Sequence, residues 1–194
     1  MLKLNENQKR SFKILSEMTT PPIVSIVGNS GSGKTTLIEK LTPEIIKRGL
    51  RVGTIKHDVH GFDMDKPGKD SWRHKQAGAS TTIISSPSKI AMVMDVDYDH
   101  KPDELLPLFP NVDIILTEGY KFENNPKLEI FRPEITKEPL CKDDEYLLAL
   151  ISDSQVNLDV PIFSTDDING VAEFLISHFN LVTVCKTDIR KATS

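Results

Sequence analysis

The sequence predicts an α/β domain built on a mostly parallel sheet that is flanked by helices and carries extra antiparallel strands. Continuous apolar runs at 23–27 and 112–117 have the composition of strands buried on both faces. A helical segment separates the run at 23–27 from a second strand at 51–55, and this order of elements forms a right-handed βαβ unit. With 194 residues, the chain has the length of one domain with a substantial core.

The expected strands are apolar or β-branched runs that end at turn residues. They lie at 23–27, 51–55, 81–86, 89–94, 112–117, 127–133, 146–152 and 160–164. Pro87 and Ser88 separate two of them, 81–86 and 89–94, which are expected to pair with each other. The segment 127–133 is interpreted as an edge strand.

The expected helices follow the spacing of apolar residues and the positions of residues that end helices. They span 6–18, Lys34–Arg48, 70–77 and 167–179. Gly49 is placed to end the second of these helices, and Pro43 is expected to kink it or to separate its last turn. The chain is thus divided into an amphipathic extension (1–20), a central domain (21–181) and a polar tail (182–194).

Composition limits the range of partners. The formal net charge of −4 and the dispersed Lys and Arg residues argue against a nucleic-acid partner. No apolar run approaches the roughly 20 residues needed to cross a bilayer, and the amino terminus is too polar for a secretory signal. Cys141 and Cys185 lie far apart and lack the spacing of metal ligands. These observations predict a cytoplasmic protein with reduced cysteines.

The stretch "GNSGSGKTT" follows the first apolar strand and opens the first long helix of the central domain. It matches G-x-x-x-x-G-K-[ST], the P-loop pattern, in the strand-to-helix context that this motif requires. Its glycines let successive backbone N–H groups face phosphate oxygens, and the helix start adds free N–H groups. The residues expected to bind the nucleotide are Gly28, Asn29, Ser30, Gly31, Ser32, Gly33, Lys34, Thr35 and Thr36.

Within this motif, Lys34 is expected to reach the β- and γ-phosphates, and the Thr35 hydroxyl to ligate Mg²⁺. A P-loop site also needs a carboxylate near the magnesium, at the end of another apolar strand. Asp113 and Glu118 lie at opposite ends of the strand 112–117, on the order of 16 Å apart. Ligands bind at the carboxyl ends of parallel strands, which selects Glu118 as metal ligand and, with Lys34, as catalytic residue.

Three stretches together resemble the MobB family of molybdopterin-guanine dinucleotide biosynthesis adapter proteins. They are "GNSGSGKTTLIEKL", "RVGTIKHDVHGFDMDKPGKDSWRHKQAGA" and "DIILTEGYK", and "VPIFSTDDINGVAEFL" is similar to the closing segment of the family. The first motif is shared by many P-loop proteins, whereas the second and third together are specific. The resemblance covers roughly residues 22–180.

The resemblance implies a P-loop protein that binds GTP, has weak GTPase activity and acts with the guanylyltransferase that attaches GMP to molybdopterin. It also implies a homodimer, in which strands outside the parallel sheet, such as 89–94 and 127–131, pair or pack between subunits. Slow hydrolysis is expected on physical grounds as well, because nothing obvious supplies an arginine finger or a water-orienting glutamine in cis. A partner or the second subunit is expected to complete the site.

The polar loop 56–75 has three interpretations. His57, Asp58 and His60 have side chains that suit several divalent metals. The loop also follows a strand directly, where a segment facing phosphate or magnesium is expected, and it can equally be a solvated excursion. Asp70 or Ser71 can cap the helix 70–77. The candidate site residues of this loop are His57, Asp58, Asp65, Lys69 and Arg73.

The signal for base recognition is weaker, because the chain has no Asn-Lys-x-Asp stretch. Asp153 follows the strand 146–152 and can accept hydrogen bonds from N1 and N2 of guanine, or it can be an ordinary turn aspartate. The pair Asp166–Asp167 is expected to cap the last helix.

Two other functions fit the P-loop. A small-molecule kinase would need an arginine-rich lid over the transferred phosphoryl group, and no two of the six arginines fall within one candidate lid. A metallochaperone NTPase would use His57 and His60 to bind Ni²⁺ or Zn²⁺.

Overall fold

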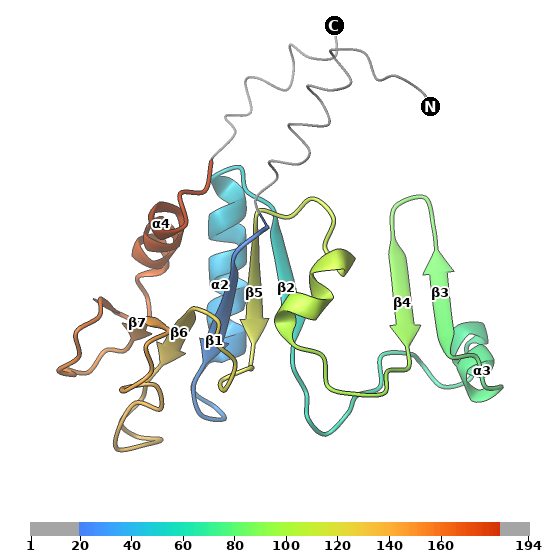
Figure 1. The fold of residues 1–194 in the computed structure, drawn as a ribbon, viewed down its shortest axis with the longest axis horizontal. Coiled ribbons are helices and arrows are strands. Elements are labelled where there is room, and N and C mark those ends of the chain that lie inside the picture. The colour runs from blue at the N-terminus through green and yellow to red at the C-terminus, as the bar shows by residue number, and fades with distance from the viewer. Residues whose placement is uncertain (1–19, 183–194) are drawn as a thin grey trace, which may run out of the picture.

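The structure is a computed structural model, and it describes residues 20–182. The expected helix 6–18 and the tail after residue 182 lie outside the described residues. Residues 20–182 form two sheets, one of six strands and one of two strands. Figure 1 shows the two-stranded sheet and a short helix set apart from the larger sheet. Among residues 20–182, no helix has the length and apolar character needed to span a membrane.

The six-stranded sheet is parallel throughout and has the order β2-β5-β1-β6-β7-β8. In chain order its strands are β1 (Ile23–Val27), β2 (Val52–Lys56), β5 (Ile114–Glu118), β6 (Lys127–Ile130), β7 (Leu147–Ile151) and β8 (Ile162–Phe163). Each of these strands overlaps an expected one. The mostly parallel α/β class predicted from the sequence is therefore confirmed.

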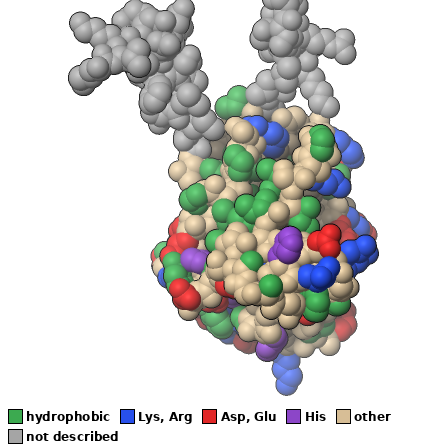
Figure 2. Space-filling model, turned by 90° about the vertical axis from the view of Figure 1, so that its right-hand side faces the viewer, with side chains coloured by type: hydrophobic (Ala, Val, Ile, Leu, Met, Phe, Trp, Pro, Cys, Tyr) green, Lys and Arg blue, Asp and Glu red, His purple; other side chains and the backbone are tan. Residues whose placement is uncertain are grey.

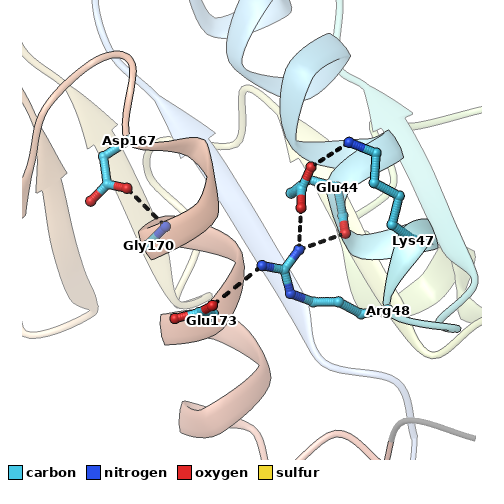
Figure 3. A network of polar contacts seen from close by, with 6 residues as sticks. All are labelled: Glu44, Lys47, Arg48, Asp167, Gly170 and Glu173. Atoms are coloured by element: carbon cyan, nitrogen blue, oxygen red, sulfur yellow. Dashed lines mark hydrogen bonds and ion pairs between the residues drawn. The ribbon is translucent and has the colours of Figure 1, made fainter. Parts of the chain in front are cut away.

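Two helices pack against this sheet and against each other, α2 (Lys34–Lys47) and α4 (Ile168–His178). Apolar side chains of both helices join the strands in one core, in which Ile26, Leu41 and Leu175 are completely buried. Burying one such side chain stabilises the fold by about 1.5–3 kcal/mol. At the rim of the contact, Arg48, which follows α2, binds Glu44 of α2 and reaches Glu173 of α4 (Figure 3).

Helix α2 ends where the sequence predicted. Gly49 has a φ of 87°, and its N–H donates to the Ile46 carbonyl oxygen at 2.9 Å, which is the backbone turn that glycine favours after a helix. Pro43 lies inside α2, and the helix continues through it as one element.

The remaining elements are α3 (Asp70–Gln76), the antiparallel pair β3 (Thr81–Ser85) and β4 (Ile90–Met94), and the 3₁₀ helix η1 (Pro102–Leu108). The helix and the strand pair were expected, whereas η1 was not. The helix cap differs from the expected one: Lys69 holds the cap position of α3 without a side-chain hydrogen bond, and Asp70 lies inside the first turn.

The interpretation of 127–133 as an edge strand is wrong. β6 lies between β1 and β7, and all four of its residues are buried. The segment 127–131 therefore does not lie outside the parallel sheet, and both edges of β6 are already paired, so the expected role between subunits is excluded for this strand.

The buried charges of β6 are satisfied by the segment 123–146. Lys127, only 1% exposed, donates to the Glu123 carbonyl oxygen at 2.6 Å and lies 3.0 Å from the Asp144 carboxylate. Glu129, also 1% exposed, accepts hydrogen bonds from the backbone N–H groups of Leu140 (2.6 Å) and Cys141 (2.8 Å). Burial also raises the pKa of the Cys141 thiol to about 12. The loop after β6 is thus held in place by the strand itself.

Replacing Glu129 tests this arrangement. In Glu129→Ala, the N–H groups of Leu140 and Cys141 lose their acceptor, and we expect the free energy of unfolding to fall by about 2–4 kcal/mol. Urea denaturation followed by circular dichroism measures the change. The control is Glu134→Ala, an exposed position two residues after Arg132, which should stay within about 0.5 kcal/mol of the parent. Equal stability of the two variants would contradict a structural role for Glu129.

Candidate nucleotide-binding site

The loop 28–33 joins β1 to α2 at the carboxyl edge of the sheet. Gly28 has a φ of 139°, and a Cβ atom there would lie 2.6 Å from the Ile130 carbonyl oxygen and 2.7 Å from Ser32 Oγ. Only glycine accepts both this backbone conformation and this close approach to β6. The first glycine of the P-loop pattern is therefore required by the neighbouring strand as well as by the turn.

Lys34, the first residue of α2, extends back across the loop. Its Nζ donates to the carbonyl oxygens of Gly28 (3.0 Å) and Asn29 (2.9 Å). Ser32 is 1% exposed, and its Oγ has no hydrogen-bond partner within residues 20–182. A buried hydroxyl without a partner is costly in a folded protein, and a phosphate oxygen is a suitable acceptor for it. The loop thus offers a cation and an unused donor to an anion.

Thr35 and Glu118 meet beside this loop. Thr35 Oγ1 lies 3.0 Å from each carboxylate oxygen of Glu118, which ends β5. The parallel register of β1 and β5 pairs Ile26 with Glu118 and so brings the end of β5 to the P-loop. Asp113 lies at the other end, where its carboxylate accepts from the Arg51 backbone N–H at 2.7 Å. The structure thus separates the two carboxylates as expected.

The Thr35–Glu118 pair fits Mg²⁺. This ion prefers hard oxygen ligands and is held by one or two protein groups together with phosphate oxygens and water. Within residues 20–182 there is no group of three or more His, Cys, Asp or Glu side chains arranged around a common metal position. Thr35 and Glu118 are the residues that would hold Mg²⁺.

His57 lies beside the end of β5, where its backbone N–H donates to the Glu118 carbonyl oxygen at 3.0 Å. It follows β2, its ring stacks on Tyr120 with centroids 4.2 Å apart, and its Nε2 is 2.8 Å from the Asp99 carboxylate. Gly119 allows the His57 side chain to lie close to the backbone of residue 119, because a Cβ atom there would be only 3.0 Å from His57 Cβ. Asp58 accepts a hydrogen bond from the backbone N–H of His60 at 3.0 Å. His57 and Asp58 therefore bind protein groups in this structure.

The other loop candidates do not reach the P-loop. Asp65 accepts from the Lys66 backbone N–H, Lys69 precedes α3, and Arg73 lies 3.7 Å from Asp70 within α3. Figure 1 shows α3 beside β3, away from the end of β1. None of Asp65, Lys69 and Arg73 lines a cavity at the P-loop.

Asp153 joins the ends of two strands. Its carboxylate accepts from the Thr165 backbone N–H at 2.9 Å and from Thr165 Oγ1 at 2.5 Å. The hydrogen bonds from Thr165 lower the pKa of this carboxyl. Asp167 caps α4 through the N–H of Gly170, as expected, whereas Asp166 instead lies 3.1 Å from Lys40 Nζ.

Arg132 was not expected at this site. Its Nε donates to the Ser32 carbonyl oxygen at 2.8 Å, so its guanidinium lies against the P-loop. The sequence contains a usable signal, since Arg132 follows a strand that lies next to β1. That signal was missed because the strand was placed at the edge of the sheet.

Two cavities flank the loop. A cavity of about 390 Å³ is lined by Gly28, Lys34, His57 and Gly119, among others. A smaller one of about 140 Å³ lies on the other side, lined among others by Gly33, Thr36, Arg132 and Thr165. The candidate site therefore extends from the Glu118 side of the loop to the ends of β6 and β7.

A parallel sheet with this loop, lysine and Thr–Glu pair defines a P-loop protein. The family described as "Molybdopterin guanine dinucleotide synthesis protein B" (MobB) matches residues 23–153. A "Molybdopterin-guanine dinucleotide biosynthesis adapter protein" of Haemophilus influenzae is 39% identical over 174 residues, which cover 87% of this chain and 97% of that protein. The chain belongs to the MobB family.

Further relatives agree with this membership. An adapter protein of the same description from Escherichia coli is 37% identical, with 81% of this chain and 93% of that protein covered. A crystal structure of molybdopterin-guanine biosynthesis protein B has a TM-score of 0.65 at 30% identity and covers 81% of this chain and 99% of its own. The Bacillus subtilis MobB structure has a TM-score of 0.64 at 29% identity, with 84% and 99% covered.

The close approach at Gly28 gives a test of the loop. In Gly28→Ala, the methyl group meets the Ile130 carbonyl oxygen, and we expect a loss of about 3 kcal/mol or more in the free energy of unfolding. Gly61→Ala is the control, because Gly61 also has a positive φ (82°) but has no atom within 4 Å of the new methyl group. That variant should lose only about 1–2 kcal/mol. Similar losses in urea denaturation would show that the contact with β6 is unimportant.

Proposed function

We propose that this chain is an adapter in molybdopterin guanine dinucleotide biosynthesis that binds GTP with Mg²⁺ through its P-loop. The geometry that supports this most directly is the Thr35–Glu118 pair beside Lys34 at the mouth of the loop. The relatives from Haemophilus influenzae and Escherichia coli are named as adapters in this biosynthesis, and this supports the pathway. We also propose a cytoplasmic location, as the composition predicts.

The residues of the site make different contacts with the nucleotide. Lys34 exchanges its carbonyl partners for phosphate oxygens and neutralises part of their charge. Ser32 Oγ, buried and without a partner among the described residues, donates to the same group. Bound Mg²⁺ would neutralise further charge on the phosphates, and Thr35 and Glu118 orient it.

Guanine recognition is assigned to Asp153. Thr165 uses two of the acceptor positions of its carboxylate, and an ionised carboxylate offers about four. The hydrogen bonds from Thr165 lower its pKa and so favour the ionised form, which an acceptor for the N1 and N2 donors of guanine requires.

Hydrolysis by the isolated chain is proposed to be slow. The glutamines among residues 20–182 are Gln76 and Gln155, and neither lines a cavity beside the P-loop. No described residue therefore resembles the water-orienting glutamine of fast GTPases. A chain that hydrolyses GTP slowly can hold it for a partner enzyme, the guanylyltransferase. GTP bound at the P-loop would then be available to that enzyme.

Nucleotide binding tests this proposal. We expect wild type to bind GTP more tightly than ATP in calorimetry with Mg²⁺, and Lys34→Ala to weaken GTP binding roughly 100-fold. Glu118→Gln should lower the Mg²⁺ affinity of the GTP complex about 10–100-fold. The matched control is Asp113→Asn at the opposite end of the same strand, which should change neither. Equal affinity for GTP and ATP would remove the guanine assignment, and full binding by Lys34→Ala would remove the P-loop assignment.

A homodimer is proposed to form through the strand pair β3–β4. Ile83 of β3 is 58% exposed and Ile90 of β4 is 74% exposed, and the register places both on one face of the pair together with the exposed side chains of Met92 and Met94. Figure 2 views the molecule from the side on which β3 and β4 lie, where hydrophobic side chains are exposed among polar and charged ones. Large exposed apolar patches are unusual on monomeric proteins, and a second copy of the chain would cover this one.

The dimer proposal is tested by light scattering after size exclusion. Wild type should elute as a dimer, and the double variant Ile83→Lys/Ile90→Lys as a monomer, because the register places both side chains on one face of the pair and four lysines would meet across the interface. Ile46→Lys, a similarly exposed position on α2, is the control and should leave the dimer intact. A monomeric wild type, or a double variant that stays dimeric, would contradict this interface.

A further inference from the structure

Arg132 is brought to the P-loop by the order of the strands. β6 runs parallel to β1, and its register pairs Val27 with Glu129. The ends of the two strands therefore lie beside each other: Gly28, which follows β1, is next to Ile130, the last residue of β6, and Arg132 is next to the turn of the loop. An arginine at this position is fixed by the sheet rather than carried on a long mobile segment.

The side chain is held at one atom and open at the others. Its Nε donates to the Ser32 carbonyl oxygen, which fixes the plane of the guanidinium. One terminal nitrogen lies 3.7 Å from the place where a Gly33 side chain would begin. Within residues 20–182, neither terminal nitrogen has a hydrogen-bond or ion-pair partner. A fixed guanidinium with two free NH₂ groups is suited to bind a phosphate with both of them.

The two cavities beside the loop indicate which phosphate this is. Lys34 lines the cavity on the Gly119 side, and the lysine of this motif contacts the β- and γ-phosphates. Arg132 lines the cavity on the opposite side, with Gly33, Thr36 and Thr165. A nucleotide whose terminal phosphates lie at Lys34 places its α-phosphate and nucleoside on the Arg132 side.

We propose that Arg132 binds the α-phosphate of the nucleotide, as a contact that the chain supplies to its own P-loop. The inference deepens the proposed function and rests on it. Arg132 is a binding residue for the nucleoside end of the ligand, and it is distinct from an arginine finger, which stabilises charge at the terminal phosphate. In this role it sets the affinity for GTP and GDP alike.

The experiment compares Arg132→Gln and Arg132→Lys with wild type in calorimetry with GTP, GDP and the two diastereomers of GTP that carry sulfur on the α-phosphate. We expect Arg132→Gln to weaken GTP and GDP by the same factor, roughly 10–100-fold. Arg132→Lys keeps the charge but lacks the planar fork, so it should recover only part of this loss. Arg51→Gln, which removes the same charge at the opposite edge of the sheet, should bind as wild type does.

The sulfur-substituted nucleotides show whether Arg132 contacts the α-phosphate directly or only holds the P-loop in its conformation. If Arg132 touches the α-phosphate, wild type prefers one diastereomer and Arg132→Gln loses most of this preference. A preference that survives in Arg132→Gln means that the residue only positions the Ser32 carbonyl, which overturns the proposal. A loss for GTP without a loss for GDP assigns Arg132 to the γ-phosphate and also overturns it.

Failure of the Arg132 inference can be distinguished from failure of the proposed nucleotide-binding function. A wild-type chain that binds no nucleotide would remove both. Nucleotide binding that depends on Lys34 but not on Arg132 would remove the Arg132 inference alone.

Discussion

The position of β1 between β5 and β6 is the constraint on which the site depends. A strand buried on both faces must pair all its backbone groups with its neighbours, so two further strands are held in parallel on either side of it. Their carboxyl ends meet at the loop that leaves β1. β5 thereby delivers Glu118 to one side of the P-loop, and β6 delivers Arg132 to the other. The order of the strands, rather than the glycine-rich motif alone, decides which charges surround the loop.

The same order explains why two charged side chains lie inside the sheet. Lys127 and Glu129 are carried on β6, where both faces are covered, and a buried charge persists only when it is paired or hydrogen-bonded. The segment 123–146 satisfies both, with a carboxylate, a carbonyl oxygen and two backbone N–H groups. These contacts fix the long connection between β6 and β7, and so they also hold the neighbourhood of Arg132.

Much of the fold could be predicted because its signals are local. Apolar runs mark the central strands, Gly49 ends α2, and the P-loop pattern needs only its strand and helix to be identified. Glu118 could be selected because parallel strands share one carboxyl edge. The neighbours of β6 could not be predicted in this way, since Lys127 and Glu129 are charged and their partners lie up to 17 and 12 positions away. Because 127–133 was interpreted as an edge strand, Arg132 was not expected beside the P-loop, which only the strands next to β1 approach.

The polar loop after β2 connects the two parts of the molecule. The chain leaves the sheet at His57 and comes back to the same point at Asp99, 42 positions later, after α3, β3 and β4. The two side chains bind each other at 2.8 Å while His57 stacks on Tyr120, two residues after Glu118. Tyr120 in turn donates to the His100 carbonyl oxygen at 3.0 Å, so the connection between β4 and η1 is held at the same point. The exposed strand pair is therefore anchored beside the magnesium-binding carboxylate proposed for this site. His57, Asp99 and Tyr120 thus join the connection after β4 to the carboxyl edge of the large sheet.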